Sequence, residues 1–530
     1  MLREIVYGLL GLLLLLYGAD LALGLGDDAR EPPRLRARIP LIGHLLGLIQ
    51  HGVSYYSKTS VRAGGGGGGG QEMYTLGVLH YKLYVCNANR LMPYIQKSAR
   101  TVSFKPFMQT AVRTHGGASD HAYEIFGDGA FLDDYSHGMK HSLAPGPHLD
   151  EQNLRMGNRV MVDIDALLSN TGKGRPGKQF FMLGWVRHAV VQASSCGVYG
   201  ANRPFVRREV EDAYWKWQSW LPAHMAQLDL FGTGYAARDV VADAYRQYLA
   251  NMPNDAALVI QERVRVQREA GMSEEDLAKM ESGFPTAVFA NTSPTLFWTI
   301  WELFSRGDVL AEVRREVEER AVTMTTAAEE QRVFELDVGA LKHRCPLLLS
   351  VYQETQRRRH VHANIRKVLA DTVLDDKYLL KAGNYLQMPG APIHDSEAIW
   401  GPTAGDFDPY RFVDHGGSSS GSHNKTGTTP APGNSAFLAW GAPPHLCPAR
   451  QFASTEILII VALLALRADL RPVDGGRGSW EYPELNRADM VTVLNPKEDV
   501  RMEVVAREEW SGHWLLKTSE STSRISLASG

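Results

Sequence analysis

The clearest candidate for chemistry in this chain is Cys447, in the stretch FLAWGAPPHLCPARQFASTEILII. The other cysteines, Cys86, Cys196 and Cys345, lie far from it in the sequence. An isolated cysteine is usually a small buried hydrophobe. Here Pro448 favours the first position of a helix and places Cys447 at the N-cap, where the helix dipole lowers the pKa of a thiol. The pattern predicts a thiolate that is a metal ligand or a nucleophile.

These two roles need different partners. A nucleophilic cysteine needs a positioned histidine with an Asn or Asp behind it, and sequence alone cannot show that pairing. A haem thiolate needs a loop that faces the iron, a helix behind the loop, and cationic partners for the propionates elsewhere in the chain. The run ARQFASTEILIIVALLAL is apolar on nearly every face and predicts a buried helix directly behind Cys447.

Two further motifs precede this loop. VYQETQRRR places Glu354 and Arg357 three residues apart, so that they share a helix face and can pair. DFDPYRF follows and carries Arg411. ExxR alone occurs often by chance, but ExxR, an FxPxRF-like segment and a cysteine loop in this order form a specific signal. Over essentially the whole chain, the sequence resembles a membrane-bound (microsomal) cytochrome P450 of fungal type.

The resemblance implies a fold and a cofactor. The fold is mostly α with small β-sheets. Cys447 is the axial ligand of haem b, and Glu354, Arg357 and Arg411 form a buried structural network. The cysteine loop departs from the family pattern FGxGxRxCxG. Pro443 stands in place of a glycine and forbids a positive φ, so we expect haem binding with a slower reaction than the family norm.

The stretch GFPTAVFANTSPTLFWTIWELF resembles the helix that crosses over the haem. Most of the family has an acid–alcohol pair there, which delivers protons during dioxygen activation. The Asn-x-x-Pro…Phe-Trp pattern is similar to the branch that contains sterol 7-hydroxylases and prostacyclin synthase. It implies that Asn291 stands in for the alcohol, with Thr292 as the nearest hydroxyl. The alternative is a helix kink at Pro294 with incidental polar residues.

Candidate partners of the haem propionates are cationic. Arg366 in HANIRKV matches the family's propionate-binding arginine on the strand after ExxR. His445 in the cysteine loop, where the family has an arginine, and Lys140 in HGMKHSL are further candidates. An ordinary surface cation is the alternative for each of the three.

Three functions stay open. The first is a monooxygenase that receives electrons from NADPH through NADPH–cytochrome P450 reductase, with cytochrome b5 as an optional donor. It inserts one oxygen atom into an apolar small molecule, which is sterol-like, a lipid or a fungal secondary metabolite. The second is a reductase-independent haem-thiolate isomerase or dehydratase that acts on a peroxide. The third is a non-catalytic haem or sterol binder.

The N-terminus predicts a membrane anchor. Residues 5–25 are almost entirely apolar and, as a helix, would cover the roughly 30 Å of a bilayer core. Four arginines follow between residues 30 and 38, so the positive-inside rule places the body in the cytosol. Residues 1–26 are therefore expected to be a single-pass transmembrane helix in the endoplasmic reticulum membrane. A cleaved signal peptide is the alternative.

The remaining segments follow from composition. Residues 27–60 read as a proline-rich, semi-rigid hinge and linker, 61–510 as the catalytic domain, and 511–530 as a polar, mobile tail. Glycines 64–70 and the stretch 414–434 are low in complexity. With 56 basic and 59 acidic residues the chain has no nucleic-acid footprint. So few cysteines in so large a chain favour free thiols in a reducing compartment over a disulfide framework.

Overall fold

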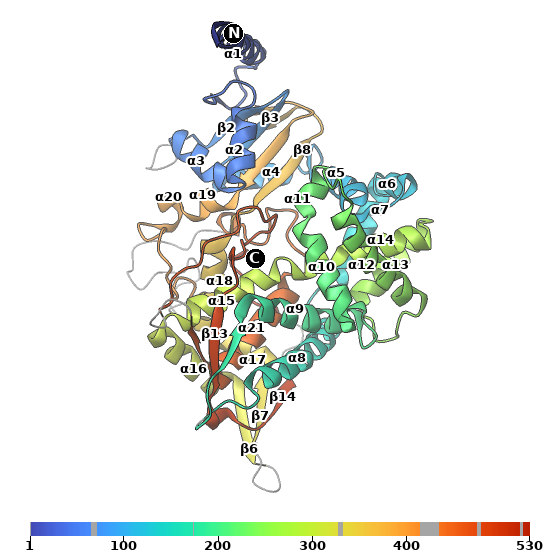
Figure 1. The fold of residues 1–530 in the computed structure, drawn as a ribbon, viewed down its shortest axis with the longest axis vertical. Coiled ribbons are helices and arrows are strands. Elements are labelled where there is room, and N and C mark those ends of the chain that lie inside the picture. Colours follow the sequence, from blue (N-terminus) through green and yellow to red (C-terminus); the bar gives the residue numbers. More distant parts are fainter. Residues whose placement is uncertain are drawn as a thin grey trace.

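The computed structural model describes residues 2–64, 71–172, 174–326, 332–413, 434–473, 479–519 and 523–529. Within these residues the chain is mostly helical with small sheets, as predicted (Figure 1). The glycine run from residue 65 and the low-complexity stretch from 414 to 433 lie outside the described residues.

The helices are α1 (Leu2–Leu25), α2 (Gly43–His51), α3 (Ser54–Arg62), α4 (Met92–Lys97), α5 (Lys105–Ala111), α6 (Asp120–Ile125), α7 (Gly129–Ser142), α8 (Pro147–Leu168), α9 (Met182–Tyr199), α10 (Arg208–Ser219), α11 (Leu221–Met225), α12 (Thr233–Ala250), α13 (Leu258–Glu269), α14 (Glu274–Phe289), α15 (Thr292–Phe304), α16 (Gly307–Ala321), α17 (Val338–Arg344), α18 (Pro346–Arg359), α19 (Gly390–His394), α20 (Glu397–Trp400) and α21 (Arg450–Arg467).

The strands are β1 (Arg34–Leu35), β2 (Met73–Val78), β3 (Tyr81–Cys86), β4 (Val102–Ser103), β5 (Lys178–Phe181), β6 (Val322–Thr326), β7 (Arg332–Asp337), β8 (Ala363–Val368), β9 (Thr372–Leu374), β10 (Tyr378–Leu380), β11 (Tyr385–Pro389), β12 (Ala468–Pro472), β13 (Arg501–Ala506) and β14 (His513–Lys517). Among the described residues they form sheets in the orders β1-β2-β3-β11-β8-β4, β10-β9, β12-β13-β5 and β14-β7-β6.

The main core forms around α15 and α21. Helix α15 packs against α9, α18 and α21, and α21 also packs against α8. Nearly every residue of α21 is buried, because the helix is apolar on nearly every face and its buried polar side chains, such as Glu456, are hydrogen-bonded. The end of α18 thereby lies against the end of α15, where Arg359 pairs with Glu302 at 2.5 Å, and Tyr352 of α18 contacts Ser454 near the start of α21 at 3.0 Å.

The helix predicted over residues 283–304 is interrupted. Helix α14 ends at Phe289 and α15 begins at Thr292, so Ala290 and Asn291 lie at the junction. Pro294 has no N–H to donate to the Ala290 carbonyl, and this missing bond explains the break. The kink considered as the alternative is therefore present, and it places Asn291 at the point where the two helices meet.

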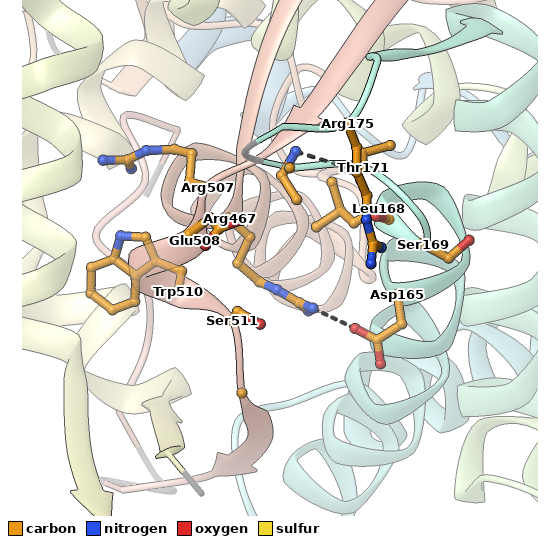
Figure 2. A pocket seen from close by; sticks show the side chains of 13 residues that line it. Asp165, Leu168, Ser169, Thr171, Arg175, Arg467, Arg507, Glu508, Trp510 and Ser511 are labelled. Carbon is orange, nitrogen blue, oxygen red and sulfur yellow. Dashed lines mark hydrogen bonds and ion pairs between the residues drawn. The ribbon is translucent and has the colours of Figure 1, made fainter.

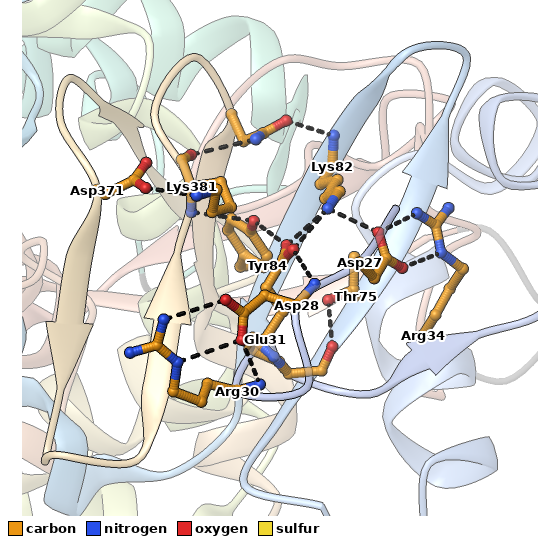
Figure 3. Close-up of polar contacts among 12 residues, drawn as sticks. Asp27, Asp28, Arg30, Glu31, Arg34, Thr75, Lys82, Tyr84, Asp371 and Lys381 are labelled. Atoms are coloured by element: carbon orange, nitrogen blue, oxygen red, sulfur yellow. Dashed lines mark hydrogen bonds and ion pairs between the residues drawn. The ribbon is translucent and has the colours of Figure 1, made fainter. Parts of the chain in front are cut away.

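The segment after α1 is held against the body rather than hinged (Figure 3). Lys82 Nζ lies 2.6 Å from a carboxylate oxygen of Asp27 and 2.7 Å from one of Glu31, and the Tyr84 hydroxyl also donates to Glu31. Arg34 pairs with Asp27 at 2.8 Å, and β1 adds a parallel strand to β2. Buried carboxylates need charged partners, and these ion pairs fix residues 27–35 to the body. The expectation of a hinge is therefore wrong for these residues.

Helix α1 is present over 24 residues, Leu2–Leu25. A search of the described residues finds no helix whose length and apolar character suffice for a membrane crossing.

Strands β2 and β3 form an antiparallel hairpin, and so do β9 and β10, whose connection contains Asp375 and Asp376, both with positive φ. Strand β13 pairs with β12 and β5.

The end of the chain is not a loose tail. Strand β14 pairs in parallel with β7, and Ile525 and Leu527 are buried in the main core. The expectation of mobility rested on polar composition, which says little about backbone pairing.

Candidate active site

The loop around Cys447 is closed by its own backbone. The N–H of Cys447 donates to the Trp440 carbonyl at 2.8 Å, and the Arg450 guanidinium donates to the Cys447 carbonyl at 3.2 Å. Helix α21 begins at Arg450 with Ala449 as its N-cap, so the predicted helix start is two residues too early. Because the loop bond holds Cys447 outside the helix, Pro448 falls in a turn and not in the first helical position.

The electrostatics of the thiol also differ from expectation. Burial raises the pKa of the Cys447 thiol, whereas an Ala449 backbone N–H and the Arg450 charge lower it by less. The predicted net lowering is wrong, because desolvation of the thiolate outweighs the helix end. Ionisation of such a buried sulfur requires a positive partner, and a metal ion is one.

Gly441 provides the tight bend in this loop. Its φ is +99°, and a Cβ atom there would lie 2.7 Å from the His445 carbonyl oxygen. A larger residue at this position would be strained and would clash. Pro443 is not among the residues with positive φ, so the loop accepts the proline that the family pattern lacks.

Arg366 on β8 is a buried cation whose guanidinium contacts no described carboxylate. It donates to the Ile365 and Ala442 carbonyls at 2.8 and 2.9 Å, and it lies over the Phe104 ring at 5.6 Å. Burial lowers the pKa of Arg366 to about 10. A buried cation normally has an anionic partner, so an anionic group of a ligand could neutralise the charge of Arg366.

His445 lies beside Arg366. Its Nε2 atom is buried without a hydrogen-bond partner, and its ring centroid is 6.3 Å from that of Phe104. Burial and, to a smaller extent, the charges of Arg366, Lys140 and Lys105 lower the pKa of His445 to about 4. The ring is therefore neutral at physiological pH.

This edge fits the propionates of a haem. A haem carries two carboxylates, and the site offers the unpaired Arg366, the orphaned Nε2 of His445 and two nearby lysines. Cys447 lies on the same loop, and among the described residues no histidine is hydrogen-bonded to its sulfur. A buried arginine without a carboxylate partner beside this loop suits a haem thiolate better than a nucleophilic cysteine.

Lys105 was missed by sequence analysis. It starts α5, directly after β4, and β4 pairs with β8 through Ser103 and Lys367. Lys105 also pairs with Asp133 at 2.7 Å. No motif signals it, because a two-residue strand pairing brings it to the site. Lys140 is exposed at the end of α7 and faces the outer side of the loop.

The structure brings Glu354, Arg357 and Arg411 together in the interior. Arg357 makes a bidentate pair with Glu354 at 2.7 Å for both bonds, and Arg411 Nε lies 3.1 Å from both Glu354 oxygens. The Asp408 N–H also donates to Glu354. Arg357 donates further to the carbonyl of Ala404, so the network fastens α18 to the segment that precedes the cysteine loop.

Asn291 and Thr292 lie at the helix break. The Thr292 hydroxyl donates to the Val288 carbonyl at 2.9 Å, while Asn291 Oδ1 accepts the Thr492 N–H at 2.9 Å. The neighbouring Ala290 packs with Val491 and other apolar side chains of the same loop. The amide oxygen of Asn291 is therefore occupied, which leaves its Nδ2 group as the donor.

Comparison with known proteins agrees with this geometry. The sequence profile of the family described as Cytochrome P450 matches residues 239–482. A cytochrome P450 monooxygenase of Hypoxylon pulicicidum, nodJ, is 31% identical over 525 residues and is covered, like this chain, to 98%. The chain belongs to the cytochrome P450 family.

Other relatives extend the comparison. A cytochrome P450 monooxygenase of Gibberella zeae is 25% identical, with 92% of this chain and 91% of the relative covered. The 5-beta-cholestane-3-alpha,7-alpha-diol 12-alpha-hydroxylase of Sus scrofa is 30% identical over 41% of this chain and 42% of its own. This cytochrome P450 is an oxidoreductase of the monooxygenase type, and membership in the family implies haem iron with thiolate ligation.

A pocket of about 430 Å³ lies elsewhere in this cytochrome P450 (Figure 2). It lies between the end of α8 and the segment that joins β13 to β14, and none of the site residues above lines it. Its central cation, Arg467, pairs with Asp165, and Arg507 pairs with Glu509. This pocket is therefore separate from the cysteine loop.

Proposed function

We propose that this cytochrome P450 inserts one oxygen atom from dioxygen into an apolar small molecule that is sterol-like, a lipid or a fungal secondary metabolite. The observation that carries the proposal is that the buried Arg366, which has no carboxylate partner among the described residues, donates to the Ala442 carbonyl of the loop that carries Cys447. The names of the relatives, monooxygenases and a sterol hydroxylase, support the reaction type and the sterol-like alternative.

Each residue then has a role. Cys447 would bind the haem iron through its thiolate, and Arg366, His445 and Lys105 would hold the propionates, whereas Lys140 lies on the outer side of the loop. The bound haem supplies an iron whose thiolate ligand favours cleavage of the O–O bond. Arg366 remains fully charged at neutral pH, since its lowered pKa is still about 10.

The junction of α14 and α15 would handle protons. Because the Asn291 oxygen is bonded to Thr492, only the Nδ2 group can face the reaction, and an amide cannot relay a proton as an acid does. The Thr292 hydroxyl donates a hydrogen bond to the Val288 carbonyl, and the lone pairs on its oxygen can still accept a hydrogen bond. We infer that an ordered water must connect these groups.

Electrons and location complete the proposal. We infer that NADPH–cytochrome P450 reductase supplies the electrons, with cytochrome b5 as an optional donor. Helix α1 would associate the protein with the endoplasmic reticulum membrane, the body facing the cytosol. The apolar cluster of Ala290, Val361, Val491 and Leu494, next to Asn291, supports an apolar substrate.

A second candidate function is a reductase-independent isomerase or dehydratase that acts on a peroxide. The presence of the Asn291 amide where most of the family has an acid–alcohol pair favours it. NADPH and reductase dependence, measured over a panel of sterols and other lipids, separates the two. Product formed only with NADPH and reductase supports the monooxygenase, and product formed from a lipid peroxide without them supports the isomerase.

Changing the proton-handling pair should uncouple the reaction. Proton delivery by a positioned group contributes about 10²–10⁴-fold to a rate, so Asn291→Ala and Thr292→Val should slow product formation and divert reducing equivalents to hydrogen peroxide. The measurement is product formed per NADPH consumed. Thr299→Val is the matched control, because that hydroxyl also bonds one turn back but is buried within α15. If product formed per NADPH were unchanged in both site variants, neither Asn291 nor Thr292 would take part in proton delivery.

Removing the buried cation should loosen the haem. Arg366→Leu deletes the charge that a propionate would neutralise, and hydrogen bonds to charged groups contribute about 1.5–3 kcal/mol. We expect haem to transfer to apomyoglobin at least tenfold faster than from the wild type. Arg471→Leu on β12 is the control, since that arginine is exposed and pairs with Glu503. Equal transfer rates for wild type and Arg366→Leu would exclude Arg366 as a propionate ligand.

A further inference from the structure

A buried histidine joins the Glu354 network to the cysteine loop. His394 ends α19, and its carbonyl accepts a hydrogen bond from Arg357 Nη1 at 2.5 Å. Its side chain bonds elsewhere, because the ring atom Nε2 accepts the Leu438 N–H at 2.9 Å. His394 and Leu438 are both buried, so water cannot easily replace either bond. One residue therefore contacts the network through its backbone and the loop through its ring.

The bond to Leu438 lies at the start of the turn that shapes the cysteine loop. The Leu438 carbonyl accepts the Gly441 N–H at 3.0 Å, and Gly441 has the φ of +99° that the tight bend requires. Within the same loop the Trp440 carbonyl accepts the Cys447 N–H at 2.8 Å. Hydrogen bonds and short turns of backbone thus connect His394 to the thiol without a gap.

The hydrogen bond fixes which ring nitrogen of His394 carries the hydrogen. Nε2 is the acceptor, so the neutral ring holds its hydrogen on Nδ1. Nδ1 is buried and has no hydrogen-bond partner among the described residues. A further proton can therefore be taken up only at Nε2. Nε2 would then be a donor that faces the Leu438 N–H, and the bond to the loop would be lost.

The charged groups that face the His394 ring oppose a positive charge on it. Burial first, and then the charges of Arg357 and Arg358 on α18, lower the pKa of His394 to about 3. The carboxylates beside these arginines are engaged, since Glu354 pairs with Arg357 and Asp395 pairs with Arg358. The ring is therefore neutral at physiological pH while the loop is closed.

The remaining neighbours of the ring are uncharged. The ring centroid of His360 lies 5.4 Å from that of His394, and burial holds the pKa of His360 well below its ordinary value. Phe437 and Trp400 lie at 5.7 and 6.3 Å between centroids. Helices α3 and α20 and strand β8 also pack against α19, but the pKa of the ring is not shifted by their charged side chains, which are Lys58, Arg62, Glu397, Arg366 and Lys367.

We propose that His394 is a positioning residue for the thiolate and an acid-sensitive link: uptake of one proton from solvent at Nε2 frees Leu438, and the cysteine loop then no longer fixes the position of Cys447. The proposal rests on the proposed function, in which the Cys447 thiolate binds haem iron. Once the loop opens, water reaches the ring and its pKa returns to about 6.5. Because the pKa is lower in the closed loop, the closed loop loses stability only below about pH 6.5, by about tenfold per pH unit in the equilibrium.

His394→Gln tests the proton. A glutamine side chain can accept the Leu438 N–H at the place of Nε2, but it does not titrate. The haem protein is reduced with dithionite under carbon monoxide, and the rate at which the thiolate band disappears is followed between pH 7.5 and pH 5. At pH 5 the variant should lose the band about tenfold more slowly than the wild type, and at pH 7.5 the two rates should be equal. Far-UV circular dichroism of the same samples should show that the band disappears before the helices unfold.

His394→Leu tests the hydrogen bond itself. It leaves the buried Leu438 N–H without an acceptor, so the band should disappear about tenfold faster than in the wild type already at pH 7.5. His115→Gln is the matched control and should keep the wild-type pH dependence. Burial also lowers the pKa of His115, to about 4, but its ring bonds Thr286 of α14 and not the cysteine loop.

The outcomes separate the inference from the proposed function. Equal rates of band loss for the wild type and His394→Gln at pH 5 would overturn the inference, even if His394→Leu does not fold. Helix loss that accompanies band loss in the wild type would also overturn it, because the acid step would then be unfolding of the whole chain. A wild-type protein that binds haem but shows no thiolate band at pH 7.5 would overturn the role of Cys447 as well.

Discussion

Replacement of Cys447 by alanine should abolish the red-shifted Soret band of the reduced carbon monoxide complex, which reports thiolate ligation of haem iron. The thiol is the sulfur ligand on this loop, and a nitrogen ligand such as His445 would not give the thiolate band if it bound the iron instead. A bond between the iron and the thiolate would stabilise the folded protein, and Cys447→Ala removes it. The haem content per protein should therefore also fall. Absorbance spectra and haem content of the purified variant are the measurements.

Cys196→Ala provides the matched control. Cys196 is also half-buried but lies in α9, away from the cysteine loop. It should keep the wild-type band and haem content. A normal thiolate band in the Cys447→Ala protein would show that another residue binds the iron, and the interpretation of the cysteine loop would then be wrong.

The parts of the site that sequence could predict are those carried by local spacing. Glu354 and Arg357 lie one helical turn apart, so an i, i+3 pattern is enough to place them on one face. Arg366 could be located because it follows ExxR on the next strand. The uninterrupted apolar run after Cys447 predicts the buried α21 for the same reason: the period of the pattern matches the structure.

The parts that sequence could not predict depend on distant pairing. Lys105 reaches the site because two residues of β4 pair with β8, which is far along the chain. Glu31 can be buried because Lys82 and Tyr84 on β3 provide its partners. These contacts fix a proline-rich segment that, from its sequence, suggests a hinge. Residues 523–529 are polar in composition, but their backbone N–H groups donate to the buried side chains of Gln451 and Gln353, which hold the segment against the core.

The pKa of the Cys447 thiol shows a second kind of limit. Local rules give the sign of the helix-end effect correctly, since the Ala449 N–H does lower the pKa. Burial acts in the opposite direction and is larger, and burial is a property of the whole fold. The helix-end rule therefore gives the correct sign for its own contribution to the pKa. The larger contribution of burial, which only the structure shows, decides the direction of the net shift.

Replacement of Glu354 by alanine should prevent the chain from reaching a stable, haem-bound state. The substitution strands two buried guanidinium groups, Arg357 and Arg411, and also leaves the Asp408 N–H without its acceptor. Breaking a buried ion pair by removing one partner costs about 3–5 kcal/mol, and a buried unsatisfied donor adds about 1–3 kcal/mol. Native proteins are stable by only about 5–15 kcal/mol, so the loss approaches the whole of it.

Haem content and the thermal unfolding midpoint of Glu354→Ala measure this loss. Arg358→Ala is the control on the same helix. The Arg358 side chain is partly exposed and pairs with Asp395, so its removal should cost no more than about 1 kcal/mol and leave the haem content normal. The contrast between adjacent arginines follows from burial alone: Arg357 is enclosed between Glu354 and backbone carbonyls, whereas water can replace the partner of Arg358. A Glu354→Ala protein with normal haem content and an unchanged midpoint would mean that the charges are solvated, and the network would then contribute no more than a surface pair.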